Sequence, residues 1–183
     1  MILKRDFYNK DALTVARLLL GHIICRKFDD GRIYKAKIVE TEAYTQDEPS
    51  CHAYCGITKR SKTLFEQAGT LYVYFTYGMY YCANVVTDKK GFGSAVLIRG
   101  VEPLTKLGEY SKTNGPAKFC KAFDITTDLN EIDITKKSSK VWIEQGENIS
   151  DKDVIQTTRI GITKATQLPW RFYIKNNIHV SKK

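Results

Sequence analysis

The chain has 183 residues, 43% of them hydrophobic and 27% charged, which is ordinary for a soluble globular protein. This length fits a single domain over residues 1–183 that buries roughly 70% of its unfolded surface. No apolar run approaches a transmembrane helix and the N-terminus lacks a signal-peptide core, so we expect no membrane partner and a cytoplasmic location. The net charge of +9 indicates an acidic partner such as DNA or RNA, although a generally lysine-rich composition is the alternative.

The first part of the chain is predicted to hold a helix followed by a strand. Asp11 can cap a helix that ends at Gly21. A strand over 23–28 follows, and residues 29–32 form the turn after it.

The next predicted strand, over 33–43, carries two carboxylates. Its even-numbered positions from Tyr34 to Ile38 are apolar and the positions between them are lysines. Continued with a period of two, this alternation places Glu40 and Glu42 on the apolar side. A carboxylate there is costly to desolvate unless it is paired or hydrogen-bonded, so both residues need partners.

A polar loop over 44–64 holds the cluster Cys51, His52 and Cys55, which could in principle supply metal ligands. A structural zinc site usually pairs two such clusters, and the other three cysteines lie in apolar stretches. The odd total of five cysteines also argues against a disulfide framework. We therefore expect neither a metal nor disulfides.

An aromatic block over 71–81 surrounds the dipeptide Tyr77-Gly78 and predicts a β-hairpin with a two-residue turn. In that register Tyr74 faces Tyr81. The ring of Tyr77 then stands at the exposed tip. A large apolar ring there buries little surface unless it inserts into a binding partner. On a basic chain, the obvious candidate is a nucleic-acid base stack.

A nearly continuous apolar run over 95–101 predicts a buried strand, which Arg99 interrupts. A guanidinium in such a strand needs a partner as much as Glu42 does, and an ion pair across the sheet would satisfy both. A purely structural ion pair at the strand end is the alternative interpretation.

The remaining elements are shorter. Asn114 is expected to cap a helix over 116–123, and strands are expected over 141–143, 159–162 and 170–174. Together these elements predict an α+β fold: a single domain with a mixed, largely antiparallel curved β-sheet, peripheral helices and a protruding β-hairpin.

Four polar residues are ambiguous from pattern alone. Tyr44 can simply cap a core at a strand end, and His52 can be an incidental loop histidine. Tyr74 lies on the opposite face of its strand from Phe75, so one of the two lines a cavity. Asn84 is an amide in a strand that otherwise reads as buried, and it can give direction-specific hydrogen bonds to a flat heterocycle.

Five segments carry a family resemblance: Val-Glu-Thr-Glu-Ala-Tyr (39–44), Cys-His-Ala (51–53), Gly-Thr-Leu-Tyr-Val-Tyr (69–74), Tyr-Gly-Met-Tyr-Tyr-Cys-Ala-Asn (77–84) and Val-Leu-Ile-Arg-Gly-Val-Glu-Pro-Leu (96–104). With them the chain resembles the alkyladenine (3-methyladenine) DNA glycosylase family over nearly its whole length. It departs from the family at Arg60-Ser61, where the usual pair is Arg-Asn.

The resemblance implies a wedge and a pocket for a flipped base. Tyr77 would enter the gap left by the extruded nucleotide. Tyr44, His52 and Tyr74 would stack on the flipped base and contact its edge. Asn84, at the pocket floor, would disfavour the binding of normal guanine, which carries an exocyclic amine.

The resemblance also implies catalytic groups. Glu42 would hold and activate the attacking water, with help from Arg99 and from the main-chain carbonyl of Ile160. Phosphate contacts are expected at Tyr80, Lys59, Arg60 and Lys118.

The implied activity is excision of damaged purines from double-stranded DNA in base excision repair. The expected lesions are 3-methyladenine, 7-methylguanine, hypoxanthine and ethenoadenine. The resemblance implies a monofunctional enzyme without a cofactor, working as a monomer at the nucleoid or, in a eukaryote, in the nucleus. Two alternatives stay open: a non-enzymatic nucleic-acid binder, and a protein-interaction domain with an aromatic core.

Overall fold

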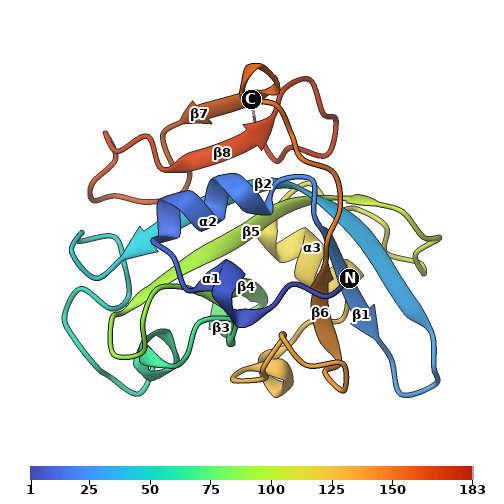
Figure 1. The fold of residues 1–183 in the computed structure, drawn as a ribbon, viewed down its shortest axis with the longest axis horizontal. Coiled ribbons are helices and arrows are strands. Elements are labelled where there is room, and N and C mark those ends of the chain that lie inside the picture. Colours follow the sequence, from blue (N-terminus) through green and yellow to red (C-terminus); the bar gives the residue numbers. More distant parts are fainter. Residues whose placement is uncertain (183) are drawn as a thin grey trace.

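The computed structural model describes residues 1–182, which form one curled β-sheet with short helices against it (Figure 1). The α-helices of this part of the chain are α1 (Arg5–Tyr8), α2 (Ala12–Leu19) and α3 (Pro116–Ala122). The strands are β1 (Ile23–Lys27), β2 (Ile33–Thr45), β3 (Leu71–Thr76), β4 (Tyr80–Val86), β5 (Ser94–Pro103), β6 (Val141–Glu144), β7 (Val154–Thr157) and β8 (Arg171–Ile174).

The long strand β2 is the centre of the sheet. The order of strands is β3-β4-β5-β2-β1-β6, and β8 pairs with both β2 and β7. Each of the strand pairs recorded for residues 1–182 is antiparallel. The α+β class with a largely antiparallel sheet is therefore confirmed.

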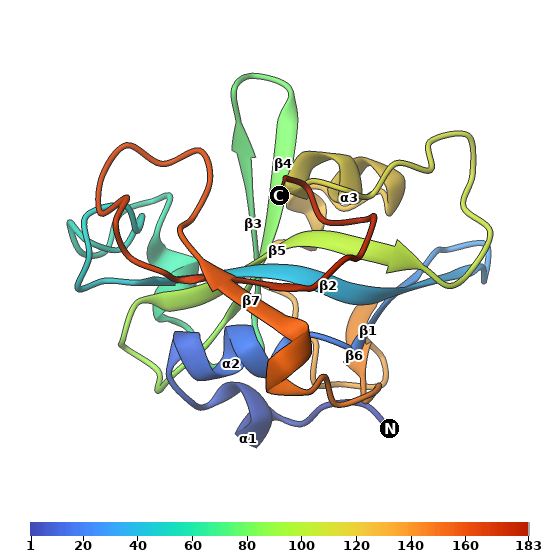
Figure 2. The same cartoon turned by 90° about the horizontal axis from the view of Figure 1, so that it is seen from above.

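Two layers cover the sheet (Figure 2). Helices α1 and α2 lie against one side, whereas α3 and the protruding β3–β4 hairpin stand on the other. As predicted, Asp11 caps α2 by accepting a hydrogen bond from the backbone N–H of Thr14 at 2.9 Å. The helix packs directly on β2, where the hydroxyl of Thr41 donates to the carbonyl of Ala16 at 2.8 Å. Nowhere in residues 1–182 is there a helix with the length and apolar character needed to cross a bilayer.

The β3–β4 hairpin has a register that differs by one residue from the predicted one. Tyr74 pairs with Cys82 and not with Tyr81, because the loop has three residues, 77–79. Both Tyr77 and Gly78 adopt positive φ angles, of 51° and 68°, which close a tight turn one residue before the ladder resumes. The prediction was wrong here because a Tyr-Gly pair does not reveal how many residues the loop contains.

The alternation along β2 holds only up to Ile38. Two register shifts between β2 and β5 then interrupt the ladder, on either side of the pair Glu40–Gly100. Every residue from Ile38 to Ala43 is buried. The alternation of faces therefore does not continue past this point. Glu40 and Glu42 are nevertheless both fully buried, as predicted.

Two smaller predictions were wrong. Asn114 does not cap α3, because the capping position is Gly115, and the Asn114 side chain accepts a hydrogen bond from Lys118 at 3.2 Å. Residues 159–162 form no strand, because the chain turns there at Gly161 with a φ of 76°; the strand is β7, which ends at Thr157.

Candidate active site

A cavity of about 590 Å³ is lined by side chains of the β3–β4 hairpin and of the loops around it. Its walls come from the end of β2, the loop before β3, strands β3, β4 and β5, the start of α3, and the loop between β7 and β8. The predicted site residues that line it are Tyr44, His52, Arg60, Tyr74, Tyr77, Asn84, Arg99 and Ile160. Residues more than 100 positions apart in the sequence, such as Tyr44 and Ile160, therefore line the same cavity.

Glu42 lies directly behind the cavity wall, fully buried. Its Oε2 accepts hydrogen bonds from the Tyr44 hydroxyl at 2.7 Å and from Nη1 of Arg99 at 3.2 Å. Its Oε1 accepts a hydrogen bond from the backbone N–H of Ile160 at 2.8 Å. The predicted ion pair between Arg99 and Glu42 is confirmed. Ile160 touches Glu42 through its amide, so the role expected for its carbonyl stays a prediction.

The charge states around Glu42 follow from burial and from the carboxylates. Burial by itself lowers the pKa of Arg99, but Glu42 and Glu40 outweigh it and raise that pKa above its ordinary value. Burial and the adjacent Glu42 carboxylate also raise the pKa of Tyr44. Arg99 is therefore held as a cation, and Tyr44 stays a neutral hydrogen-bond donor.

Glu40 anchors the other side of Arg99. Its Oε1 lies 3.3 Å from Nε of Arg99 and 2.7 Å from Nε of Arg171. The backbone N–H and hydroxyl of Ser181 also donate to Glu40, at 2.6 and 2.8 Å. Neither Arg171 nor Ser181 was among the residues predicted for the site. Arg171 lies in the short apolar run Trp-Arg-Phe-Tyr, so, like Arg99, it is a charged residue in an apolar segment that needs a partner. No pattern in the sequence indicates a role for Ser181.

Aromatic side chains form a second wall. Nδ1 of His52 lies 3.0 Å from the hydroxyl of Tyr72, and the His52 ring meets the Tyr74 ring edge-on, with centroids 4.7 Å apart. The Arg60 guanidinium lies over Tyr74, 5.2 Å from its centroid. Burial and Arg60 lower the pKa of His52 to about 4, so His52 is uncharged at neutral pH. Tyr72 was missed, although it precedes Tyr74 by the period of two that puts both on one face.

A row of paired residues crosses the sheet beneath the cavity. Tyr72 pairs with Asn84, Asn84 with Leu97, and Leu97 with Glu42. Directly paired residues in neighbouring strands share a face of the sheet, so all four face the cavity side. The Asn84 side chain is buried and its Nδ2 donates to the carbonyl of Tyr72 at 3.1 Å, which fixes the amide at the cavity floor.

Tyr77 stands at the hairpin tip with 82% of its surface exposed, and it lines the cavity mouth. Its φ of 51° lies in the left-handed region, which costs a residue other than glycine roughly 1–2 kcal/mol. A large exposed ring in a strained conformation stabilises neither the core nor the turn. Strain of this kind is typical of functional positions.

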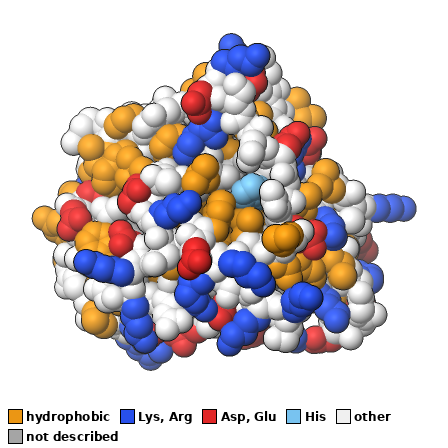
Figure 3. All heavy atoms as spheres, in the orientation of Figure 1, with side chains coloured by type: hydrophobic (Ala, Val, Ile, Leu, Met, Phe, Trp, Pro, Cys, Tyr) orange, Lys and Arg blue, Asp and Glu red, His pale blue; other side chains and the backbone are white. Residues whose placement is uncertain are grey.

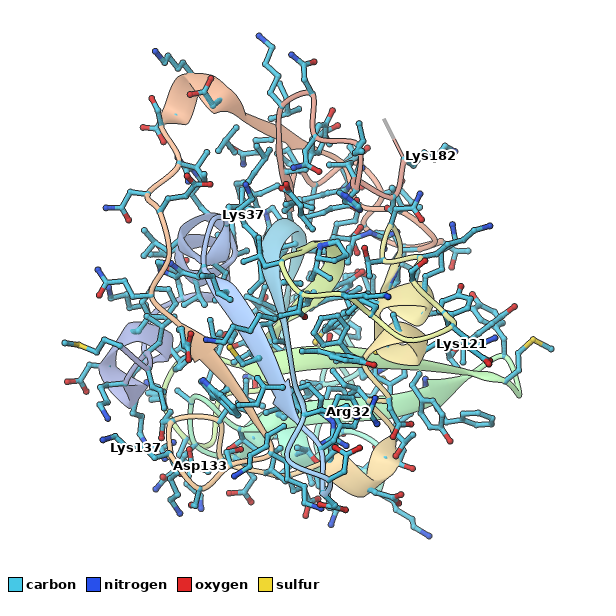
Figure 4. All side chains as sticks on the ribbon, turned by 90° about the vertical axis from the view of Figure 1, so that its right-hand side faces the viewer. Arg32, Lys37, Lys121, Asp133, Lys137 and Lys182 are labelled. Carbon is cyan, nitrogen blue, oxygen red and sulfur yellow. The ribbon has the colours of Figure 1, made fainter. Side chains whose placement is uncertain are left out.

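The residues predicted to contact phosphate are all exposed, and they lie on three segments: Tyr80 at the start of β4, Lys59 and Arg60 in the loop before β3, and Lys118 in α3. Figure 4 shows Lys121, also of α3, on the side of the molecule from which the hairpin protrudes, with Lys137 on the opposite side. The face with α1 and α2 intersperses basic, acidic and apolar side chains (Figure 3). Within residues 1–182, no three His, Cys, Asp or Glu side chains gather closely enough to hold a metal ion.

A buried pair that was not predicted joins Arg159 to Glu48, with Nη1 of Arg159 2.6 Å from Oε1 of Glu48. Arg159 directly precedes Ile160 in the chain, and Glu48 precedes His52 by four positions. Glu48 lies in the predicted polar loop and Arg159 at the first position of a predicted strand, so neither pattern indicates burial, and only the structure reveals this pair.

The sequence is similar to those of known proteins. The model of the methylpurine-DNA glycosylase family matches residues 6–178. A protein of Carboxydothermus hydrogenoformans is 45% identical over 193 aligned positions, covering 100% of both chains. Another, of Francisella tularensis, is 46% identical over 182 positions, covering 93% of this chain and 94% of the other. Both bear the name "Putative 3-methyladenine DNA glycosylase". The chain therefore belongs to the methylpurine-DNA glycosylase family, the DNA glycosylases that serve base excision repair of alkylation damage.

Proposed function

We propose that the protein flips damaged purines out of duplex DNA and hydrolyses their N-glycosidic bond with a water activated by Glu42. The observation that carries this proposal is the position of Glu42, fully buried immediately behind a cavity whose lining residues hold it in place. Hydrogen bonds and a guanidinium partner favour the charged form of a buried carboxylate. An ionised carboxylate can accept the proton of a water.

The hydrogen-bond capacity of Glu42 leaves room for that water. A carboxylate offers about four acceptor positions. Within residues 1–182, the donors that reach Glu42 are the hydroxyl of Tyr44, Nη1 of Arg99 and the amide of Ile160. These donors leave one position unfilled, and the three residues that separate Glu42 from the cavity all line it. General-base help of this kind contributes about 10²–10⁴-fold to a rate.

The same carboxylate suits the charge that develops in the reaction. Cleavage of an N-glycosidic bond passes through a sugar with oxocarbenium character, as in glycoside hydrolysis. The negative charge of Glu42 stabilises that cation, while Arg99 keeps the carboxylate oriented. A ring-alkylated purine is already cationic and leaves readily. A neutral lesion such as hypoxanthine must first be protonated, so its excision depends more on pH.

The walls of the cavity suit a flipped purine. Chemistry on a base requires its removal from the stack, at a cost of a few kcal/mol that is lower for a damaged or mispaired base. The ring of Tyr77 replaces the lost stacking, and the rings of Tyr44 and Tyr74 receive the base. His52 is uncharged at neutral pH and so does not repel a cationic purine. The fixed amide of Asn84 leaves no room for the exocyclic amine of guanine.

We further propose that the enzyme is a monomer and is monofunctional, so that it does not cleave the DNA strand. Strand cleavage by a glycosylase needs an amine that attacks the sugar. Lys164 lines the cavity and is the amine to test. Borohydride reduction in the presence of a lesion duplex should yield no protein–DNA adduct. An adduct that disappears in the Lys164→Ala variant would show a bifunctional enzyme.

The decisive experiment uses duplex DNA with one hypoxanthine or one 3-methyladenine. The expected products are the free base and a strand that breaks only after alkali treatment. A non-enzymatic nucleic-acid binder would shift the duplex in a gel without releasing base, and a protein-interaction domain would do neither. A panel of duplexes with single lesions then gives the substrate range.

A further inference from the structure

Arg159 and Glu48 form a two-point ion pair next to the cavity but do not line it. Nη1 of Arg159 lies 2.6 Å from Oε1 of Glu48, and Nη2 lies 3.1 Å from Oε2. The side chains are 0% and 5% exposed. The pair joins the loop after β2 to the loop after β7, which are 111 positions apart in the sequence.

Arg159 holds the end of β2 as well as its own loop. Nη1 also donates to the carbonyl of Ala43 at 2.9 Å, and the guanidinium lies 4.6 Å from the centroid of the Tyr44 ring. The next residue, Ile160, donates its N–H to Glu42 at 2.8 Å. This side chain therefore contacts the Tyr44 ring that lines the cavity, and it directly precedes the amide that binds the buried carboxylate.

Glu48 holds the segment that leads to His52. Its Oε2 accepts hydrogen bonds from the backbone N–H of Ser50 at 2.8 Å and from the Ser50 hydroxyl at 2.5 Å. Ser50 lies two positions before His52, whose Nδ1 is 3.0 Å from the hydroxyl of Tyr72. Three segments of the site thus converge on this single ion pair.

Stability alone is a weak reason for such a pair. The desolvation of a buried ion pair is costly, and well-packed apolar residues of similar volume often stabilise a protein equally well. In addition, Nε of Arg159 is buried without a hydrogen-bond partner among residues 1–182. An unpaired buried donor is itself unfavourable. The planar fork of an arginine does, however, fix the relative orientation of the groups that it joins.

We propose that Arg159 and Glu48 are positioning residues for excision: the pair sets the Ile160 amide against Glu42 and the Tyr44 ring against the flipped base. This inference rests on the function proposed above for Glu42. Neither residue contacts the reacting atoms. Their effect passes through Glu42, Tyr44 and the His52 segment.

The test compares Arg159→Lys and Glu48→Gln with a matched control, Arg5→Lys. Arg159→Lys keeps the charge and removes the planar fork, and Glu48→Gln keeps the shape and removes the charge. Arg5 also bridges two distant segments, with Nη2 2.7 Å from Asp133, but it lies away from the cavity. Three quantities are measured: hydrogen exchange at the Ile160 amide, the maximal single-turnover rate of base release, and affinity for a duplex with an abasic-site analogue.

A positioning role predicts a local change. In both site variants the Ile160 amide should exchange at least about tenfold faster, while amides of β2 and β5 keep their protection. The rate of base release should fall by up to about 10²-fold, the typical effect of a misplaced catalytic group. Affinity for the abasic analogue, which has no base to hold, should equal that of the wild type, and Arg5→Lys should match the wild type in all three measurements.

Other outcomes overturn the inference. Unchanged exchange at Ile160 with an unchanged rate would show that the pair positions nothing. Faster exchange throughout β2 and β5, or failure of both variants to fold where Arg5→Lys folds, would show a purely structural pair. If the wild type releases no base from any lesion duplex, the proposed function fails, and the positioning of Glu42 for excision fails with it. If the wild type releases base and both Arg159→Lys and Glu48→Gln release it at the wild-type rate, only the inference about the ion pair is overturned.

Discussion

Glu42 and Asn84 are both register partners of Leu97, so the buried carboxylate and the floor amide face the same side of the sheet, with one strand between them. The three strands that carry these residues keep this spacing through backbone hydrogen bonds and not through flexible side chains. The proposed base pocket on Asn84 therefore lies at a set distance from Glu42.

Replacement of Glu42 by glutamine should abolish excision while lesion binding persists. The amide keeps the shape of the side chain but cannot accept the proton of the water, so the rate of base release should fall by about 10²–10⁴-fold. Single-turnover release and gel-shift titration measure the two effects. Glu102→Gln is the matched control, since Glu102 lies on β5, half-buried and outside the cavity. Excision by Glu42→Gln at nearly the parental rate would show that Glu42 is not the base.

Tyr77→Ser should weaken the capture of lesion DNA and leave the fold intact. The exposed ring contributes nothing to the core, and stacking of an aromatic ring on a base is worth about 1–3 kcal/mol. Titration of lesion and undamaged duplexes should therefore show a loss confined to the lesion duplex. Tyr54→Ser is the control, because Tyr54 is also exposed, at 51%, but does not line the cavity. Equal affinities for both duplexes in wild type and variant would argue against a wedge.

Binding of DNA should weaken steeply with added salt. The chain carries a net charge of +9, and each phosphate contact releases a counterion. Lys118→Ala should lower the slope of log K against log salt by about 1 if Lys118 contacts a phosphate. Lys137→Ala should leave the slope unchanged, because Lys137 lies on the side of the molecule away from the hairpin (Figure 4). Identical slopes for wild type and Lys118→Ala would remove Lys118 from the set of phosphate contacts.

His52 should make stability depend on pH in acid. Burial and Arg60 lower its pKa from 6.5 to about 4 in the folded protein, so between these values the unfolded chain binds a proton that the folded chain does not. The free energy of unfolding should therefore fall as the pH drops through this window, on the order of 1–2 kcal/mol after allowance for solvent screening. Urea unfolding at several pH values measures it. The variant His52→Gln should lack this component, and coincident pH curves for the two proteins would contradict the assignment.

Local signals in the sequence determined much of this protein. The cap at Asp11, the alternation from Tyr34 to Ile38 and the apolar run around Arg99 each depend on neighbouring residues, so helix, strands and the need for an ion pair could be predicted. The family resemblance added the identities of the residues that line the cavity, such as His52.

The tertiary structure decided how these elements meet. The predicted two-residue turn would have placed Asn84 on the opposite face from Tyr74; the observed three-residue loop puts both on the cavity side. A slip of one residue reverses every side chain of a strand, and the turn sequence did not specify the loop length. Contacts such as Arg159 with Glu48, 111 positions apart, arise from chain folding over long distances, which no local pattern encodes.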